Sequence, residues 1–304
     1  MRGLLGWLLM RVPRRALLAF FGGLGVLAWA LGIRRRVVRD NLRLAFPEKT
    51  EAERRTIARA TYRRLGEMIP DFLRVPYLTP AELAQLFEYE GWDGLERAKA
   101  GGKGVIACTA HFGQFDLLAA AHNLRGHPIT TISRKMRVGL WKGTRARAGV
   151  QEIYVERGGT LSAAVRALKA GRVLGYVIDQ SESSKSAVFP TFFGVPVATA
   201  ATPAVLARRT GAAVVFVVSV PQPDGRHKVV IEGPLTVPDT GDLSRDALLF
   251  MQDLNDRLER WVRRAPEHWY WLHRRWKRRR PVPASASLSG SGSGSEMDAD
   301  PPVR

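Results

Sequence analysis

His111 and Asp116 are the two residues whose types and spacing best suit catalysis. The histidine follows a short, glycine-flanked apolar run, 105–110, which is typical of a buried strand. The aspartate precedes an Ala- and Leu-rich run, 117–121, which favours a helix. Five residues is not a same-face helical spacing, so the pair converges only if His111 lies on a turn and Asp116 on the first helical turn. Gly113 makes such a turn easy to form.

An imidazole held by a carboxylate can take a proton from a hydroxyl group, because the carboxylate fixes the tautomer and stabilises the imidazolium. The sequence places no Ser, Cys or Thr as a protein nucleophile beside His111, so a substrate hydroxyl would take that part. The alternative for an isolated pair at this spacing is a strand-end histidine that is bonded to the backbone.

Further motifs follow in the chain, and together they carry a family resemblance. The segment His-Phe-Gly-Gln-Phe-Asp at 111–116 resembles the H-x4-D/E motif of the glycerolipid acyltransferases, and its Phe and Gly look like the lipid A late acyltransferases (lauroyl and myristoyl transferases). Asp-Gln at 179–180 with Phe-Phe-Gly-Val-Pro-Val-Ala-Thr at 192–199 resembles a second motif of that family. The segment 266–277 is similar to its C-terminal Trp- and Arg-rich signature. The resemblance covers roughly residues 5 to 280.

The resemblance implies transfer of an acyl chain, from an acyl carrier protein or acyl-CoA thioester, to a hydroxyl of a lipid A precursor without a covalent acyl-enzyme. It also implies a location at the inner membrane with the catalytic domain on the cytoplasmic side. We expect no cofactor and no catalytic metal, because the other histidines show no metal-ligand spacing. The sequence departs from the family pattern at Asp116, where Glu is usual, and at Gln114 and Phe115, where Asn and Trp are usual. These departures leave another glycolipid acceptor open, such as a phosphatidylinositol mannoside.

By the same resemblance, His111 and Asp116 are catalytic, and substrate binding falls to six residues: Arg145, Arg147, Asp179, Gln180, Phe193 and Gly194. Of the two arginines, Arg145 is the better match, and a guanidinium suits a phosphate or a developing oxyanion. Asp179 ends an apolar strand, and it shares a sheet edge with His111 if the two strands are parallel. Each assignment has a structural alternative. Arg145 would be a solvated surface residue, Asp179 would only form a turn, and the phenylalanines would only pack in the core.

The charge is strongly basic, with 47 Lys and Arg against 28 Asp and Glu, a net charge of +19. Such a balance attracts acidic carrier proteins, phosphorylated lipids, anionic membranes or nucleic acid. We expect the first three as partners and no nucleic acid. A competing hypothesis is a non-catalytic, membrane-anchored protein that binds nucleic acid or anionic lipid through the aromatic and basic segment 269–280. It differs from the enzyme hypothesis in predicting that His111→Ala leaves function intact.

An uncharged apolar segment, 16–33, predicts an N-terminal membrane anchor that spans the bilayer or lies in its interface. A cleaved signal peptide and a buried core helix are the alternatives. Arginines on both flanks leave its orientation open. The Ser-, Gly- and Pro-rich end predicts a disordered tail. The expected organisation is therefore an anchor over 1–35, an acyltransferase domain over 36–280 and a tail over 281–304.

The fold class expected is α/β, with a mixed, partly parallel sheet and helices on its faces, preceded by the membrane-anchor helix. The predicted strands are 105–110, 129–133, 152–155, 173–178, 213–220 and 228–232. The predicted helices in the same region are 116–124, 160–170, 199–210 and 244–264. Closer to the N-terminus, helices are predicted over 36–45, 51–68 and 81–89, with Pro70 expected to end the second.

Overall fold

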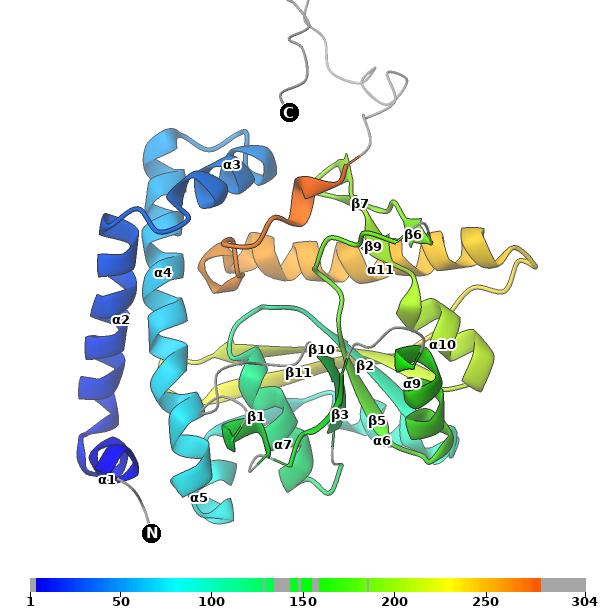
Figure 1. Cartoon of the computed structure of the whole chain (residues 1–304), viewed down its shortest axis with the longest axis horizontal. Coiled ribbons are helices and arrows are strands. Elements are labelled where there is room, and N and C mark those ends of the chain that lie inside the picture. Colours follow the sequence, from blue (N-terminus) through cyan, green and yellow to red (C-terminus); the bar gives the residue numbers. More distant parts are fainter. Residues whose placement is uncertain are drawn as a thin grey trace, which may run out of the picture.

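The computed structural model describes residues 4–127, 129–133, 143–146, 149–154, 159–184 and 186–279. Arg147 and the predicted tail over 281–304 lie outside these residues. A seven-stranded sheet with the strand order β1-β11-β10-β2-β5-β3-β4 forms the centre of the fold (Figure 1). Its strands are β1 (Phe87–Glu90), β2 (Val105–Thr109), β3 (Ile129–Ser133), β4 (Gln151–Tyr154), β5 (Val173–Val177), β10 (Ala213–Pro221) and β11 (His227–Leu235).

The sheet is mostly parallel, since only the pairing of β10 with β11 is antiparallel. Parallel sheets need cover on both faces, and β2 shows how this sequence meets that need. Ile106 and Cys108 belong to one core, whereas Val105 and Ala107 belong to a second core on the other face. The predicted mixed α/β sheet is therefore confirmed, including all six of its predicted strands.

Helices cover the two faces of the sheet (Figure 1). One layer contains α6 (Trp92–Ala100) and α7 (Leu118–Leu124), and the other contains α9 (Thr160–Lys169), α10 (Thr202–Thr210) and α11 (Leu243–Arg264). Two short strand pairs stand outside the main sheet, β6 (Ala187–Val188) with β9 (Thr199–Ala200) and β7 (Thr191–Phe192) with β8 (Val195–Pro196). Short helical pieces connect these parts: α5 (Pro80–Ala84), η1 (Val75–Tyr77), η2 (Phe115–Leu117), η3 (Pro266–His268) and η4 (Arg275–Lys277).

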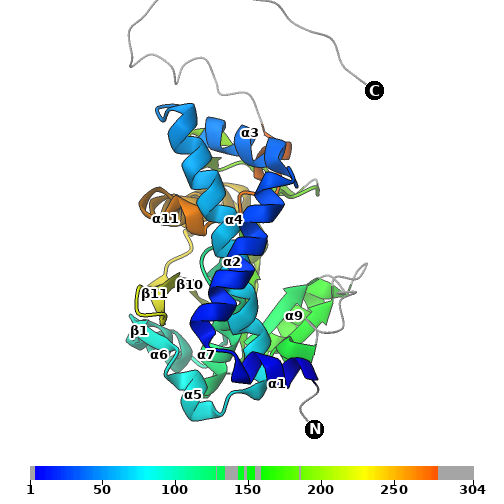
Figure 2. The same cartoon turned by 90° about the vertical axis from the view of Figure 1, so that its left-hand side faces the viewer.

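The N-terminal part of the chain adds four helices along one side of the sheet domain (Figures 1 and 2). They are α1 (Leu4–Arg11), α2 (Arg14–Ala30), α3 (Arg35–Ala45) and α4 (Glu51–Arg74). Helices α2 and α4 pack so closely that a Cβ on Gly25 would lie 2.0 Å from the Tyr62 carbonyl oxygen. The same holds for Gly66 and the Phe21 carbonyl oxygen, also at 2.0 Å. Glycine is therefore required at this helix crossing.

Most of the predicted anchor over 16–33 lies in one helix, α2, which ends at Ala30. Within the described residues, no single helix is both long and apolar enough to cross a membrane. Helices α2 and α3 together reach that length and composition, but the chain bends by 89° between them.

Two local predictions are wrong. Pro70 does not end a helix, because α4 continues through it to Arg74. Its ring is buried, and the neighbouring Asp71 binds Arg14 and His227, so tertiary contacts outweigh the lost helical hydrogen bond. Phe87–Glu90 is not helical but forms the edge strand β1, which pairs with β11. Its Phe-Glu-Tyr-Glu sequence has the period-two alternation of a strand.

The C-terminal segment after α11 folds back over the domain, and the buried Arg275 holds it there. The Arg275 guanidinium donates hydrogen bonds to the Gln180 and Ala198 carbonyl oxygens (3.1 and 3.0 Å) and to Thr199 Oγ1 (2.7 Å). Burial lowers the pKa of Arg275 to about 10. This one side chain thus ties the end of the domain to the segments that follow β5 and β8.

Replacing Arg275 with leucine should destabilise the fold, because three acceptors would lose their partner. Each buried group left unpaired costs about 1–3 kcal/mol, so we expect a loss on the order of 3 kcal/mol or more in the free energy of unfolding. Thermal unfolding followed by circular dichroism measures it. Arg274→Leu is the matched control, because Arg274 is the exposed neighbour. Equal melting temperatures for the two variants would contradict this role of Arg275.

Candidate active site

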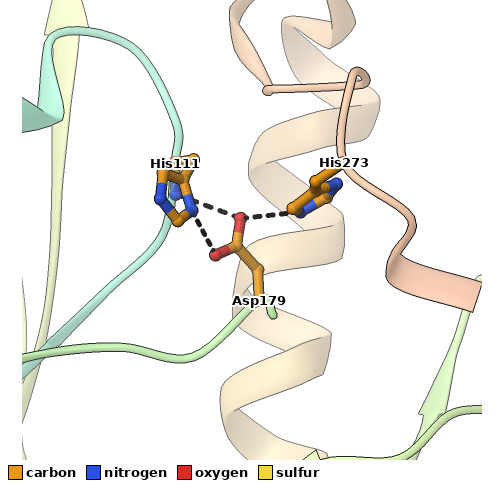
Figure 3. Close-up of side chains that lie close together, drawn as sticks. All are labelled: His111, Asp179 and His273. Atoms are coloured by element: carbon orange, nitrogen blue, oxygen red, sulfur yellow. Dashed lines mark hydrogen bonds and ion pairs between the residues drawn. The ribbon is translucent and has the colours of Figure 1, made fainter. Parts of the chain in front are cut away.

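His111 lies just beyond the carboxyl end of β2, in the turn that the sequence predicts. Strand β5 is the parallel neighbour of β2, and Thr109 is in register with Val177. The two strands therefore end at the same sheet edge, which places Asp179 beside His111. Figure 3 shows both side chains pointing toward one another, with His273 approaching Asp179 from the C-terminal segment.

Asp179 is fully buried and collects hydrogen bonds on both of its carboxylate oxygens. Its Oδ1 lies 2.8 Å from His111 Nδ1, and its Oδ2 accepts from the His111 backbone N–H at 3.0 Å. The indole Nε1 of Trp269 donates to the same Oδ2 at 2.8 Å. His273 Nε2 lies 3.5 Å from Oδ2, within ion-pair distance. The carboxylate is thus fixed from three directions.

The charges of this cluster shift two pKa values. Burial disfavours the charged Asp179, but the charge and hydrogen bond of His111, with a further contribution from His273, hold the pKa of Asp179 well below its usual value. Asp179 is therefore an anion at neutral pH, so His111 Nδ1 must be the hydrogen-bond donor of the pair. Burial lowers the pKa of His111, but Asp179 and then Asp116 outweigh it and raise that pKa above its ordinary value.

Asp116 takes a different place from the one that its spacing suggests. The sequence predicts that Asp116 holds the imidazole; in the structure His111 Nδ1 bonds Asp179, and Asp116 Oδ1 accepts a hydrogen bond from Arg145 at 2.9 Å. Arg145 also lies 3.4 Å from Glu152 Oε1, so it links the start of the 115–124 helical segment to β4. Asp116 still acts on His111, because its charge helps to raise the histidine pKa.

The turn between His111 and Asp116 is held by backbone contacts on both sides. Gly113 has a positive φ of 56°, and a Cβ there would lie 1.7 Å from the Ser219 carbonyl oxygen. Its N–H donates to the His268 carbonyl oxygen at 2.8 Å, and the Tyr270 N–H donates to the His111 carbonyl oxygen at 2.9 Å. The C-terminal segment therefore fixes the position of the histidine.

A cavity of about 260 Å³ opens beside the histidine. It is lined by His111, Gln180, Ser181, Tyr270, His273, Arg274 and Lys277. The His111 and Tyr270 rings lie 5.9 Å apart, centroid to centroid. Arg274 and Lys277 give the cavity a positive charge, which suits a phosphorylated or carboxylate-bearing ligand.

The structure brings some of the predicted site residues together and keeps others apart. His111, Asp179 and Gln180 meet at the cavity, and Asp116 and Arg145 form an adjoining ion pair. Phe193 instead packs against Phe46, Trp271 and Trp276 in a buried aromatic cluster. Gly194 has a positive φ and turns the β7–β8 hairpin. The contacts of these last two residues are therefore packing and turn contacts.

Sequence reasoning missed three residues of the site: His273, Tyr270 and Trp269. All three lie in the segment 266–277, whose resemblance to a family signature could have flagged them. They reach His111 and Asp179 because that segment folds back from α11, about 90 residues after Asp179 in the chain. No local spacing reveals such a contact.

The side chains of His111, Asp179 and His273 offer three nitrogen or oxygen atoms within 4.8 Å of one another, so they could in principle hold a metal ion. Both oxygens of Asp179, however, already accept N–H hydrogen bonds. A carboxylate that orients an imidazole fits this donor pattern better than a metal ligand does.

The comparisons with known proteins give the family. A family model described as bacterial lipid A biosynthesis acyltransferase matches residues 3–278. The chain belongs to the bacterial lipid A biosynthesis acyltransferases. This acyltransferase is 29% identical over 278 residues to the lipid A biosynthesis palmitoleoyltransferase of Escherichia coli, covering 90% of this chain and 89% of that protein.

Other relatives agree with this assignment. The lipid A biosynthesis lauroyltransferase of Escherichia coli is 28% identical over 90% of this chain and 89% of its own length. A lipid A biosynthesis acyltransferase of Haemophilus influenzae is 24% identical, over 87% of this chain and 83% of its own. The predicted family is therefore confirmed, and so is the prediction that the chain is an acyltransferase.

Proposed function

We propose that this acyltransferase moves a fatty acyl chain from an acyl carrier protein thioester to a hydroxyl of a lipid A precursor, with His111 as the general base. The observation that carries the proposal is the hydrogen bond between His111 Nδ1 and the buried carboxylate of Asp179. It leaves Nε2 as the ring nitrogen that meets a substrate at the cavity. The names of the relatives supply the acyl acceptor class.

The reaction needs no acyl-enzyme. His111 Nε2 takes the proton of the acceptor hydroxyl as the oxygen attacks the thioester carbonyl. The tetrahedral intermediate then collapses, the carbon–sulfur bond breaks, and the thiolate leaves with the proton from the imidazolium. Asp179 stabilises that imidazolium and keeps the ring in the productive tautomer. Asp116 adds negative charge near His111 and holds Arg145 in place.

The charge of the protein supports both proposed substrates. A net charge of +19 favours an encounter with an acidic carrier protein. At the cavity, Arg274 and Lys277 suit the phosphate of a phosphopantetheine arm or of a lipid A precursor. Of the remaining predicted binding residues, Arg145, Arg147 and Gln180 are proposed to contribute to the same substrate path. Phe193 and Gly194 are proposed to contribute indirectly, by holding the β7–β8 hairpin in place. No metal or cofactor is part of this proposal.

We place the enzyme at the inner membrane, with the catalytic domain on the cytoplasmic side. Large apolar side chains of the N-terminal helices support a membrane contact, because they are exposed: Trp7, Phe20, Leu27 and Leu31 are 50, 63, 51 and 70% accessible. Exposed apolar area on this scale marks an interaction surface. Helices α1 and α2 are therefore proposed to serve as the anchor.

A transfer assay tests the proposed function. Purified protein in detergent is given a radiolabelled tetra-acyl lipid A precursor and equal concentrations of acyl carrier protein and acyl-CoA thioesters of several chain lengths. We expect transfer with the carrier protein thioesters and at least about a tenfold lower rate with the acyl-CoA forms. His127→Ala, which alters a histidine near Glu96, is the matched control and should retain the wild-type rate.

The assay has two outcomes that would change the proposal. A preference for acyl-CoA would overturn the donor assignment while leaving the histidine mechanism in place. Failure with the lipid A precursor, together with transfer to a phosphatidylinositol mannoside, would overturn the acceptor assignment.

A further inference from the structure

Helices α2, α3 and α4 form an elbow on the N-terminal side of the fold (Figures 1 and 2). Residues of these three helices line a second cavity. Its volume is about 1100 Å³. It shares no lining residue with the cavity at His111. The residues that line it are Val26, Trp29, Ala30, Arg35, Arg39, Leu42, Glu51, Ala52, Arg54, Arg55, Thr56 and Arg59.

This elbow cavity is strongly positive, with five arginines against one glutamate. The Glu51 carboxylate already forms ion pairs with Arg39 and Arg54, whose guanidinium nitrogens lie 3.3 and 3.6 Å from its oxygens. Within the part of the chain that the structure describes, Arg55 and Arg59 have no carboxylate within ion-pair distance. The buried Nε of Arg54 has no hydrogen-bond partner there. The cavity therefore holds donors and charge that an anion would satisfy.

The other wall of the elbow cavity is apolar, formed mainly by Val26, Trp29 and Leu42. A stripe of large apolar residues is exposed on another side of α2. These are Phe20, Leu24, Leu27 and Leu31, which are 63, 44, 51 and 70% accessible. At about 100° per residue, the four lie within roughly 60° of one another around the helix. By the same count, Ala30, which lines the cavity, lies about 60° from Leu27, so the stripe meets the cavity at Ala30.

We propose that the elbow cavity binds the phosphate headgroup of an anionic glycerophospholipid, whose acyl chains lie along the exposed stripe of α2. Charge alone would suit a free phosphate equally well, but the apolar wall and the adjoining stripe fit the glycerol and acyl parts of a lipid. The bound lipid is a resident membrane lipid and not a substrate, because the site is separate from the cavity at His111. The inference does not rest on the proposed reaction.

The double variant Arg55→Gln/Arg59→Gln tests this site. Both side chains are exposed and lack ion pairs, so the variant should fold like the wild type, which its melting temperature checks. Binding is measured by co-sedimentation of the full chain with phosphatidylcholine vesicles that do or do not contain phosphatidylglycerol. Each basic residue near an anionic membrane strengthens binding. We therefore expect the dissociation constant of the double variant for the phosphatidylglycerol vesicles to be about thirtyfold larger than that of the wild type. Binding to pure phosphatidylcholine vesicles should be unchanged.

The matched control removes two charges elsewhere. Arg166→Gln/Lys169→Gln alters exposed residues of α9, on the opposite side of the fold from α2 (Figure 1). It should change binding by about twofold or less. Equal losses in the two double variants, or no loss in Arg55→Gln/Arg59→Gln, would overturn the proposal in favour of general surface attraction.

A competition experiment separates a lipid from a free phosphate. Glycerol 3-phosphate has the headgroup chemistry without acyl chains, so we expect millimolar amounts to leave vesicle binding unchanged. Native mass spectrometry should find phosphatidylglycerol retained on the wild type but not on Arg55→Gln/Arg59→Gln. Complete displacement by glycerol 3-phosphate would show that the cavity binds phosphate alone and would overturn the lipid assignment.

Discussion

His111→Ala is expected to lower the kcat of acyl transfer by about a thousandfold, within the 10²–10⁴ range that a general base contributes. The variant removes the only group that, in our account, accepts the proton of the acceptor hydroxyl. The acyl donor and acceptor should still bind, because the basic side chains of the cavity remain. The measurement is the initial rate of transfer at saturating concentrations of both substrates.

The control for this prediction must separate chemistry from folding. The His111 side chain is only partly exposed, so a melting temperature should accompany each rate. His127→Ala should match the wild type in rate. An unchanged rate for a folded His111→Ala would show that His111 is not the general base and would contradict the proposed mechanism.

Asp179→Asn is expected to lower kcat by a similar factor, about 10³-fold or more. Three N–H groups, from His111 Nδ1, the His111 backbone and Trp269, point at its two carboxylate oxygens. An amide offers one oxygen and one NH₂ group, so at least one of these donors would face another donor. The imidazole would lose the charge that stabilises its protonated form and the contact that fixes its tautomer.

Asp116→Asn is the informative comparison for Asp179→Asn, because the charge of Asp116 raises the pKa of His111. A general base must be neutral, so kcat/KM should rise as the pH increases through the pKa of His111, which lies above its ordinary value. Removing the Asp116 charge should lower that pKa and move the rise to lower pH, with a smaller loss of kcat than in Asp179→Asn. A shift to higher pH would contradict the account.

Much of the fold was predictable because the strands are short apolar runs that alternate with helices. Strands β2 and β5 were recognised in this way, and the parallel arrangement put Asp179 at the same sheet edge as His111. The motifs at 111–116, 179–199 and 266–277 predicted the acyltransferase family. The edge strand β1 was missed because two glutamates in four residues weaken the apolar signal of a short strand.

The partner of His111 could not be predicted from local spacing. The H-x4-D motif suggests a pair within one turn, but the direct hydrogen bond comes from a residue 68 positions away. The spacing predicts that the turn brings Asp116 near, whereas the register of two parallel strands decides which carboxylate meets Nδ1. Likewise, the contacts of Trp269 and His273 depend on how the C-terminal segment folds back over the sheet.

The most direct test of the central claim is a double-mutant cycle on His111 and Asp179, measured as the rate of acyl transfer. If the two residues act as one proton-transfer unit, Asp179→Asn should cost about 10³-fold in the wild type but about threefold or less in the His111→Ala background. If the two losses multiply instead, Asp179 acts independently of His111, and the proposed pairing is wrong.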